Sequence, residues 1–310
     1  MSGKVALLPN RVAVDVGALE AMHGNLKAKL ADATLRCAER GRCEYSSHFI
    51  LRVLRLSNTV IAESGFVPVR YVGYESGRLY AQGVSLQVAP RDIKRTALNR
   101  QWEYDIENAH FDIFTQMAAE RGLDCPHIRH YTTNKQAVRS MLARELDLTI
   151  DQVKACLLSA MYGARASERG ANAIPHAIGQ EKSRALYRHP IFRDILTEIK
   201  QGRELILRYA PTHRGFMGNA ADKGIAVKKS APQRLAHLVQ GVEARMLAVV
   251  VRMYGQHLGL VQHDGWTSAQ RLDVRGIEDQ IYSETGFRVR ISEEQLSLPE
   301  EARLPGLQAA

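Results

Sequence analysis

The stretch YDIENAH, residues 104–110, carries the clearest indication of the fold. Asp105 lies at the end of a short strand flanked by apolar residues, and a helix is predicted to follow it. A second aspartate, Asp264, has a similar position, because the strand LGLVQ (258–262) meets the turn HDG. Two aspartates from separate strands, brought side by side, would suit a pair of Mg²⁺ ions. Taken singly, each is better explained as a helix cap or a turn residue, since Asp is favoured at both.

The composition is that of a basic globular protein. Lys and Arg number 42 against 33 Asp and Glu, so the net charge is +9. This balance favours a polyanionic partner through counterion release, although it also suits a basic enzyme without one. No apolar run approaches the ~18 residues of a membrane span, no signal peptide is visible, and the four cysteines have no zinc-site spacing. We therefore expect a cytoplasmic protein without a membrane partner.

Apolar spacing predicts a largely helical chain with two strand-rich parts. Helices are predicted over 11–39, 46–63, 135–163 with a split near 146–148, 182–209 with a break at Pro190, 232–256 and 274–285. Strands are predicted within 66–90 and at FRVRI, residues 287–291. The Gly-rich and basic range 210–230 is predicted to be a mobile loop.

One predicted helix carries residues suited to a nucleotide. In VKACLLSAMYG (153–163), Lys154, Leu158 and Tyr162 fall on or near one face. A lysine there can meet a triphosphate while the tyrosine stacks beside a base pair. An ordinary helix with a surface lysine and a core tyrosine explains the same pattern.

Five pieces of the chain resemble, in the same order, motifs of the family A DNA polymerases and, more distantly, of the single-subunit phage-type RNA polymerases. These pieces are SGRL (76–79) followed by Leu86-Gln87 and Pro90, YDIENAH (104–110), K-x7-Y-G (154–163), VQG (239–241) and VQHD (261–264). His130 adds a sixth match by its separation from Lys154. The resemblance covers about residues 74–292.

The resemblance implies a minimal α+β right-hand polymerase, with a palm of antiparallel sheet plus helices, helical fingers and a reduced helical thumb. The implied parts are a thumb-like region at 1–70, palm at 71–115 and 231–298, fingers at 116–230 and a disordered tail at 299–310. Too few residues precede the first motif for an exonuclease domain plus a full thumb, so proofreading is not expected.

Each matching residue takes an implied role. Asp105 and Asp264 would be catalytic and hold two Mg²⁺ ions, for which Mn²⁺ could substitute. The triphosphate and nucleotide would meet Lys154, also catalytic, with His130, Leu158, Tyr162 and His110. The primer-template would meet Arg78, Gln87, Gln240 and His263. The implied partners are nucleic acid, nucleoside triphosphates and other replication or transcription proteins.

The chain departs from the family pattern at four positions, which keeps alternatives open. His110 replaces a carboxylate, Ile150 an arginine, Gly265 an acidic residue and Leu158 an aromatic residue or Met. A DNA polymerase without proofreading is the first expectation. A single-subunit RNA polymerase or primase, a non-catalytic nucleic-acid-binding replication protein and a Mg²⁺-dependent nuclease are the alternatives.

Overall fold

The computed structural model describes residues 8–22, 65–82, 85–89, 91–164, 172–255 and 257–298. Within these ranges helices combine with small antiparallel sheets, so the α+β class is confirmed. Most of the predicted thumb-like region, including the helix expected at 46–63, lies outside the described residues, as does the predicted tail. In the described part of the chain no helix is both long and apolar enough to cross a membrane.

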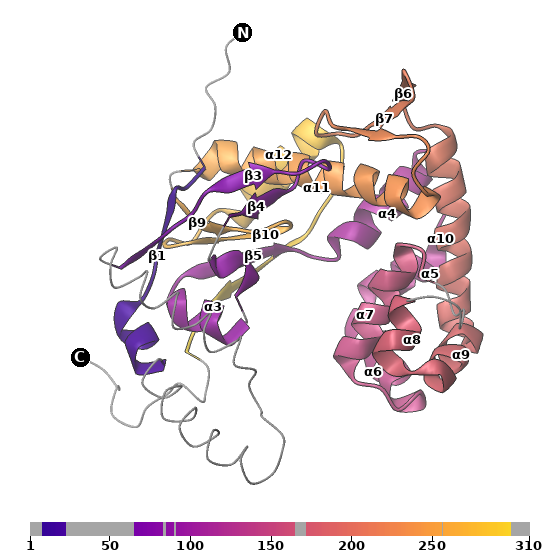
Figure 1. The fold of residues 1–310 in the computed structure, drawn as a ribbon, viewed down its shortest axis with the longest axis horizontal. Coiled ribbons are helices and arrows are strands. Elements are labelled where there is room, and N and C mark those ends of the chain that lie inside the picture. Colours follow the sequence, from indigo (N-terminus) through magenta and orange to yellow (C-terminus); the bar gives the residue numbers. More distant parts are fainter. Residues whose placement is uncertain are drawn as a thin grey trace.

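A four-stranded antiparallel sheet lies at the centre of the fold, in the spatial order β11-β5-β10-β9 (Figure 1). Its strands are β5 (Trp102–Ile106), β9 (Leu258–Val261), β10 (Gly265–Ser268) and β11 (Ile291–Gln295). Because side chains alternate along a strand, β5 buries Tyr104 and Ile106 and turns Asp105 to the other face. On the buried face Tyr104 stacks on Trp266, with ring centroids 5.7 Å apart. The apolar face of the sheet is thus part of the core, and the polar face is free to form a site.

Long helices pack beside the sheet. They are α4 (Ala109–Ala119), α10 (Pro190–Arg208), α11 (Ala231–Tyr254) and α12 (Val274–Thr285). The helix α11 contacts the other three. It begins with a capping box in which Ser230 accepts a bond from the Gln233 N–H and Gln233 bonds back to the Ser230 backbone. The predicted helices at 232–256 and 274–285 are therefore confirmed.

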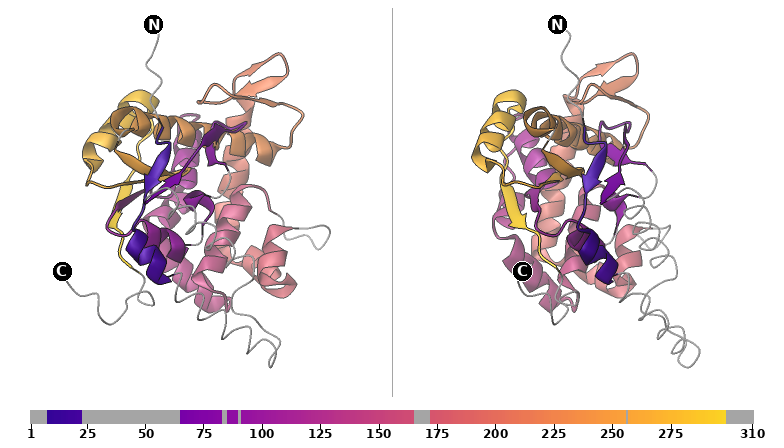
Figure 2. Two further views of the ribbon diagram at one scale, coloured as in Figure 1. Left: turned by 60° about the vertical axis from the view of Figure 1, so that its left-hand side comes forward. Right: turned by 90° about the vertical axis from the view of Figure 1, so that its left-hand side faces the viewer.

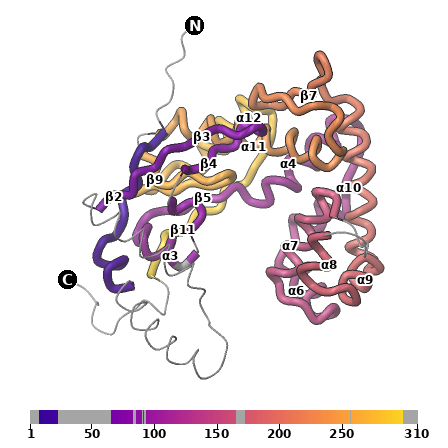
Figure 3. The backbone as a smooth tube through the Cα atoms, in the orientation of Figure 1, coloured from indigo at the N-terminus to yellow at the C-terminus, as the bar shows by residue number. Residues whose placement is uncertain are grey.

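A second group of helices lies to one side of the sheet, against α10 (Figures 1 and 3). It contains α5 (Pro126–Thr133), α6 (Lys135–Glu145), α7 (Ile150–Met161), α8 (Ala173–Ile178) and α9 (Gln180–Arg188). The predicted split near 146–148 is confirmed, since α6 ends before it and Thr149 caps α7. The predicted break at Pro190 is also confirmed, because a proline without an N–H suits the first turn of a helix.

The N-terminal strands pack near the other edge of the sheet, where β1 contacts β9. This part contains β1 (Arg11–Ala13), β2 (Phe66–Pro68), β3 (Tyr71–Gly73), β4 (Leu79–Ala81), the 3-10 helix η1 (Leu86–Val88) and α3 (Arg91–Ala97). The prediction that a helix begins at residue 11 is wrong, since Arg11–Ala13 pairs with Phe66–Pro68 and helix follows only at 16–22. The strand partner lies more than 50 residues away in sequence, beyond the reach of a local pattern.

The range 210–230 is not the mobile loop that its composition predicts. It forms a three-stranded antiparallel sheet of β6 (Thr212–His213), β7 (Phe216–Gly218) and β8 (Gly224–Ala226). Figures 1 and 2 show this sheet projecting beyond the helices between α10 and α11. Its strands are too short for an apolar alternation to be visible in the sequence.

The predicted strand FRVRI is displaced, because β11 begins only at Ile291. The Gln116 side chain explains the displacement: its amide donates to the Arg288 carbonyl and accepts from the Arg288 N–H, each at 2.8 Å. The backbone groups that a strand partner would need at Arg288 are therefore bonded to α4.

Candidate active site

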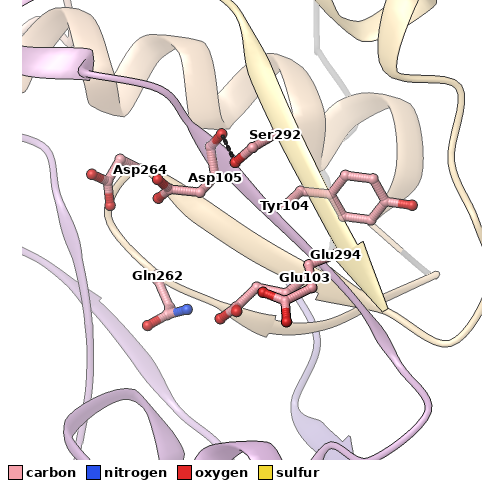
Figure 4. Close-up of a pocket in the computed structure, with 7 residues that line it drawn as sticks. All are labelled: Glu103, Tyr104, Asp105, Gln262, Asp264, Ser292 and Glu294. Atoms are coloured by element: carbon pink, nitrogen blue, oxygen red, sulfur yellow. Dashed lines mark hydrogen bonds between the residues drawn. The ribbon is translucent and has the colours of Figure 1, made fainter. Parts of the chain in front are cut away.

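The sheet brings Asp105 and Asp264 side by side. Strand β10 pairs with β5 so that Gly265 lies opposite Asp105, and the Ile106 N–H donates to the Asp264 carbonyl at 2.8 Å. The turn between β9 and β10 is closed by a 2.8 Å bond from the Gln262 N–H to the Gly265 carbonyl. Figure 4 shows both carboxylates beside each other, with Tyr104 turned the opposite way. Two residues 159 positions apart in sequence thus share one end of the sheet.

Gly265 makes this approach possible. A Cβ atom at this position would lie 2.7 Å from the Tyr104 carbonyl oxygen and 3.5 Å from a carboxylate oxygen of Asp105. The acidic residue that the resemblance predicts here would have no room in this conformation. The departure from the family pattern therefore has a steric reason within this chain.

The two aspartates border a pocket of about 300 Å³. Its lining residues are Glu103, Tyr104, Asp105, Gln262, Asp264, Ser292 and Glu294. Burial, followed by the charge of Asp264, raises the pKa of Asp105 to about 7. Burial, followed by the charge of Glu243, also raises the pKa of Asp264. Two carboxylates with raised pKa values repel each other, and a divalent cation between them would relieve the repulsion.

The donor chemistry of this pair suits Mg²⁺. Carboxylate oxygens are hard ligands, and Mg²⁺ commonly takes only one or two from a protein, keeping waters and substrate phosphates for its other positions. Across the ranges that the structure describes, no group of three or more His, Cys, Asp or Glu side chains is arranged to hold a metal ion. The aspartate pair thus offers two carboxylates, a number that Mg²⁺ commonly takes from a protein.

Two lysines act electrostatically on Asp105. Lys154 is exposed on α7, and its charge lowers the pKa of Asp105, against the larger effect of burial. Lys135, at the start of α6, has the same effect and lies 3.9 Å from Glu107. The sequence predicted Lys154 but missed Lys135, which belongs to none of the matched motifs.

The other predicted nucleotide residues of the helical group differ in exposure. His130 is exposed in the last turn of α5, two helices before α7, which carries Lys154. Leu158 is partly buried and packs against the main core, and Ile150, the position where an arginine was expected, is 39% exposed. The exposed side chain at position 150 is therefore apolar, and it offers no positive charge to a phosphate.

A buried charge cluster lies next to the aspartates. Glu243 of α11 is 0% exposed and accepts two bonds from Arg78, both at 2.7 Å. The Nε2 atom of His110 lies 2.8 Å from Glu243 and 2.6 Å from Arg78. Burial by itself would raise the pKa of Glu243, but the bonds from His110 and Arg78 outweigh it, and the pKa lies below its ordinary value.

The sequence missed Glu243, although one signal for it was present. Its position in α11 is four residues after Val239, on the apolar stripe, where a charged residue is unusual unless it is paired. The backbone at Gly77 explains how Arg78 reaches it. Gly77 has φ of 95°, and a Cβ there would lie 2.6 Å from the Cβ of Ala221, in the β7–β8 turn, and 3.2 Å from the Cβ of Ala244 on α11, so only glycine allows the β3–β4 turn to approach α11.

Tyr162 joins this cluster to α7. Its ring meets the ring of His110 edge-on, with centroids 5.4 Å apart. Burial raises the pKa of Tyr162, and its hydroxyl has no hydrogen-bond partner among the described residues. The contact places His110 between the helical group and the aspartate pair.

The residues predicted to meet primer and template divide into two kinds. Arg78 is bonded to Glu243, and the Gln87 amide accepts from the Ala81 N–H and donates to the carbonyls of Leu79 and Val261, which ties β4 to β9. Gln240 instead lines a separate groove, and His263 lies at the turn beside Asp264. Arg78 and Gln87 therefore have intramolecular partners. Gln240 borders a groove, and His263 adjoins Asp264 in sequence.

Among solved structures, one with a similar fold is the POL domain of Pol1 from M. smegmatis in complex with DNA primer-template and dNTP. The TM-score is 0.62 with 14% sequence identity, over 93% of this chain and 67% of that one. No protein-family model matches the sequence, and no curated protein sequence matches it either. The comparison shows that this chain has the fold of a DNA polymerase domain.

Proposed function

We propose that this protein is a template-directed nucleotidyltransferase that adds nucleotides to a 3′-hydroxyl. The observation that carries the proposal is the juxtaposition of Asp105 and Asp264 at one end of the sheet, each with a raised pKa. The fold shared with a DNA polymerase domain and the basic net charge support it. A polyanionic partner and a nucleoside triphosphate follow as its ligands.

Asp105 and Asp264 would hold two Mg²⁺ ions, which supply Lewis-acid activation of the attacking oxygen and stabilisation of the leaving oxygen. The 3′-hydroxyl attacks the α-phosphate in line, and pyrophosphate leaves. Lys154 binds the triphosphate as a charge-assisted donor, and Lys135 and His130 are further proposed donors to it. Tyr162 and His110 form the wall beside the nascent base pair.

Deoxynucleotides are the proposed substrates. In the enzymes that the chain resembles, the position of His110 faces the sugar. Its Nε2 atom is already within hydrogen-bond distance of Glu243 and Arg78, whichever tautomer is present. The ring is therefore fixed as a bulky wall, which excludes a 2′-hydroxyl by size.

The test is extension of a primed DNA template by Asp105→Asn and Asp264→Asn variants. Each should lose at least about 10³-fold in rate, because a bound metal contributes several kcal/mol of transition-state stabilisation. Template binding and thermal unfolding should stay near wild type. Asp112→Asn is the matched control, since burial also raises the pKa of this α4 carboxyl, to about 6, and it lines a different pocket.

The same assay separates the alternatives. Cleavage without extension would indicate a Mg²⁺-dependent nuclease, and retention of template with neither reaction would indicate a non-catalytic binding protein. Extension with NTPs alone would indicate an RNA polymerase or primase. Undiminished extension by either asparagine variant would remove that aspartate from the mechanism.

A further inference from the structure

The segment 287–290, which joins α12 to β11, presents two arginines on one side. Phe287 and Val289 are each 9% exposed and belong to the main core, whereas Arg288 and Arg290 are exposed. The alternation of apolar and basic residues that predicts a strand here is therefore kept as an alternation of burial, although β11 begins only after it. The burial pattern places both arginines on the solvent-facing side of the segment.

Bonds to α4 and to the residues just before it hold the backbone of this segment in place. The Glu107 N–H donates to the Arg290 carbonyl at 2.8 Å. The Gln116 side chain bonds both backbone groups of Arg288. The two arginines therefore extend from a fixed backbone, which lowers the entropy that a ligand would have to remove on binding.

The guanidinium groups of these arginines have free donors. Within the described ranges neither group forms an ion pair or donates a hydrogen bond, although Arg290 acts electrostatically on Asp112. The Arg288 guanidinium carbon lies 4.1 Å from the centroid of the Tyr282 ring. Stacking of this kind engages the flat face of a guanidinium and leaves its N–H edge available to an acceptor.

Both arginines line a pocket of about 240 Å³ whose other walls come from α4 and α5. The α5 wall contributes Arg129 and the hydroxyls of Thr132 and Thr133. We call this cavity, between Arg129 on one wall and Arg288 and Arg290 on the other, the arginine pocket.

The lining of the arginine pocket is positively charged. It contains three arginines and, among the described residues, one acidic side chain, that of Asp112. Burial raises the pKa of Asp112 to about 6, and the charge of Arg290 acts in the opposite direction. Arg129 forms an exposed ion pair with Asp124, so its charge is partly compensated. The two uncompensated charges are those of Arg288 and Arg290.

The size and shape of the pocket favour a compact anion over a chain. Its volume of about 240 Å³ equals that of about eight water molecules in the liquid, at roughly 30 Å³ each. A sugar–phosphate chain is bound along a groove, by contacts that repeat from one nucleotide to the next. Here the donors come from separate elements and converge on one cavity, and arginine forks and hydroxyls are suited to phosphate oxygens.

We propose that the arginine pocket binds a compact phosphate anion, for which inorganic pyrophosphate is the probe. Arg288 and Arg290 donate to its oxygens from one wall, and the α5 side chains donate from the other. The lining includes neither of the paired aspartates nor Lys154, so this site is separate from the proposed active site. A ligand held by both walls ties α5 to the segment that leads into β11.

The first test is calorimetric titration of the protein with pyrophosphate in EDTA at low ionic strength. Arg288→Ala and Arg290→Ala should each weaken binding roughly 10- to 100-fold, because charge-assisted hydrogen bonds are lost. Arg290→Lys keeps the charge but not the fork, so its affinity should lie between those of wild type and Arg290→Ala. Arg275→Ala is the control and should bind within about 2-fold of wild type, since Arg275 is exposed on α12 and outside the lining.

Two further measurements locate the anion. Lys154→Ala should bind pyrophosphate as wild type does, whereas a large loss would place the anion at the proposed active site. Phenylglyoxal modifies accessible arginines, and peptide mass spectrometry of the wild-type protein reads each position. Pyrophosphate should protect Arg288 and Arg290 but not Arg275, and a primer-template should protect neither of the two.

The proposal would be overturned by an absence of saturable binding, by equal losses in Arg275→Ala and Arg290→Ala, or by protection from the primer-template alone. If an arginine variant unfolds, the protection pattern of the wild-type protein still decides. Both tests proceed without metal and without catalysis. Failure of primer extension would therefore contradict the proposed function and leave the arginine pocket unaffected.

Discussion

Two groups of carboxylates lie close together in this protein, and their pKa values are shifted in opposite directions. Asp105 and Asp264 stand beside each other with raised pKa values, although Lys154 and Lys135 partly offset the charge at Asp105. Glu243 is fully buried but has a lowered pKa, since Arg78 and His110 both bond to it. A carboxylate whose negative charge is compensated by residues of the same chain stabilises the fold. A pair of carboxylates whose charge is only partly compensated would be stabilised by a bound cation. The comparison supports our proposal that the aspartate pair, rather than Glu243, holds the metal ions.

The largest expected effect is on stability, and it has opposite signs in the two arrangements. Glu243→Gln leaves the buried Arg78 without its charge partner and should lower the free energy of unfolding by about 3–5 kcal/mol. Asp264→Asn removes a repulsion and should leave the stability of the metal-free protein unchanged or higher. Urea denaturation in EDTA measures both. Equal losses in the two variants would show that the contrast between the arrangements is wrong.

The next prediction concerns His110, which is within hydrogen-bond distance of Arg78 and Glu243 in the buried cluster. His110→Ala should relax discrimination between a dNTP and the matching NTP by roughly 10- to 1000-fold, because the wall beside the sugar is removed. Paired measurements of kcat/KM give the ratio. Tyr162→Phe is the control, since it keeps the ring contact with His110 and removes only a hydroxyl without a partner among the described residues.

Three other results of the His110→Ala measurement would each contradict the role of His110 as a wall beside the sugar. A selective loss of NTP use would mean that His110 bonds a ribose hydroxyl. An equal loss for both substrates would mean that it only positions Tyr162. An unchanged ratio would remove His110 from sugar selection and, with it, the main reason for proposing deoxynucleotides.

The smallest expected effect is a pH dependence of stability without metal. The pKa of Asp105 is about 7 in the folded protein and roughly 3.9 in an unfolded chain. Between these values the folded state binds more protons, so stability falls as the pH rises from about 4 to about 7. Glu243 acts oppositely: its pKa is lowered, so its contribution is present above its unfolded pKa and is lost as the pH falls through its folded pKa.

The measurement is thermal unfolding in EDTA between pH 5 and 8 for wild type and Asp105→Asn. The difference between the two curves isolates Asp105 from the histidines that titrate in the same range. We expect the variant to lose part of the downward slope, and added Mg²⁺ to reduce that slope in wild type only. Parallel curves in EDTA would contradict a raised pKa at Asp105.

Much of the helical part of the fold could be predicted because its signals are local. Apolar spacing located α11 and α12, and Pro190 marked the start of α10. The strand–helix junction at Asp105 was predicted for the same reason. The errors fall on β1 and on β6–β8, where strands of two or three residues exist only through their partners, and on the displaced strand β11.

By itself, the sequence determined most of the described helices, the position of Asp105 at a strand end and the placement of Lys154 on α7 with Tyr162 at its C-terminal end, because each depends on residues a few positions apart. The tertiary structure alone decided which groups meet. Glu243 reaches Arg78 across 165 positions through the packing of α11 against the β3–β4 turn. The aspartates meet because β10 pairs with β5 in one register, which Gly265 permits. Charge compensation depends on distances in space, and a linear pattern of residues does not contain them.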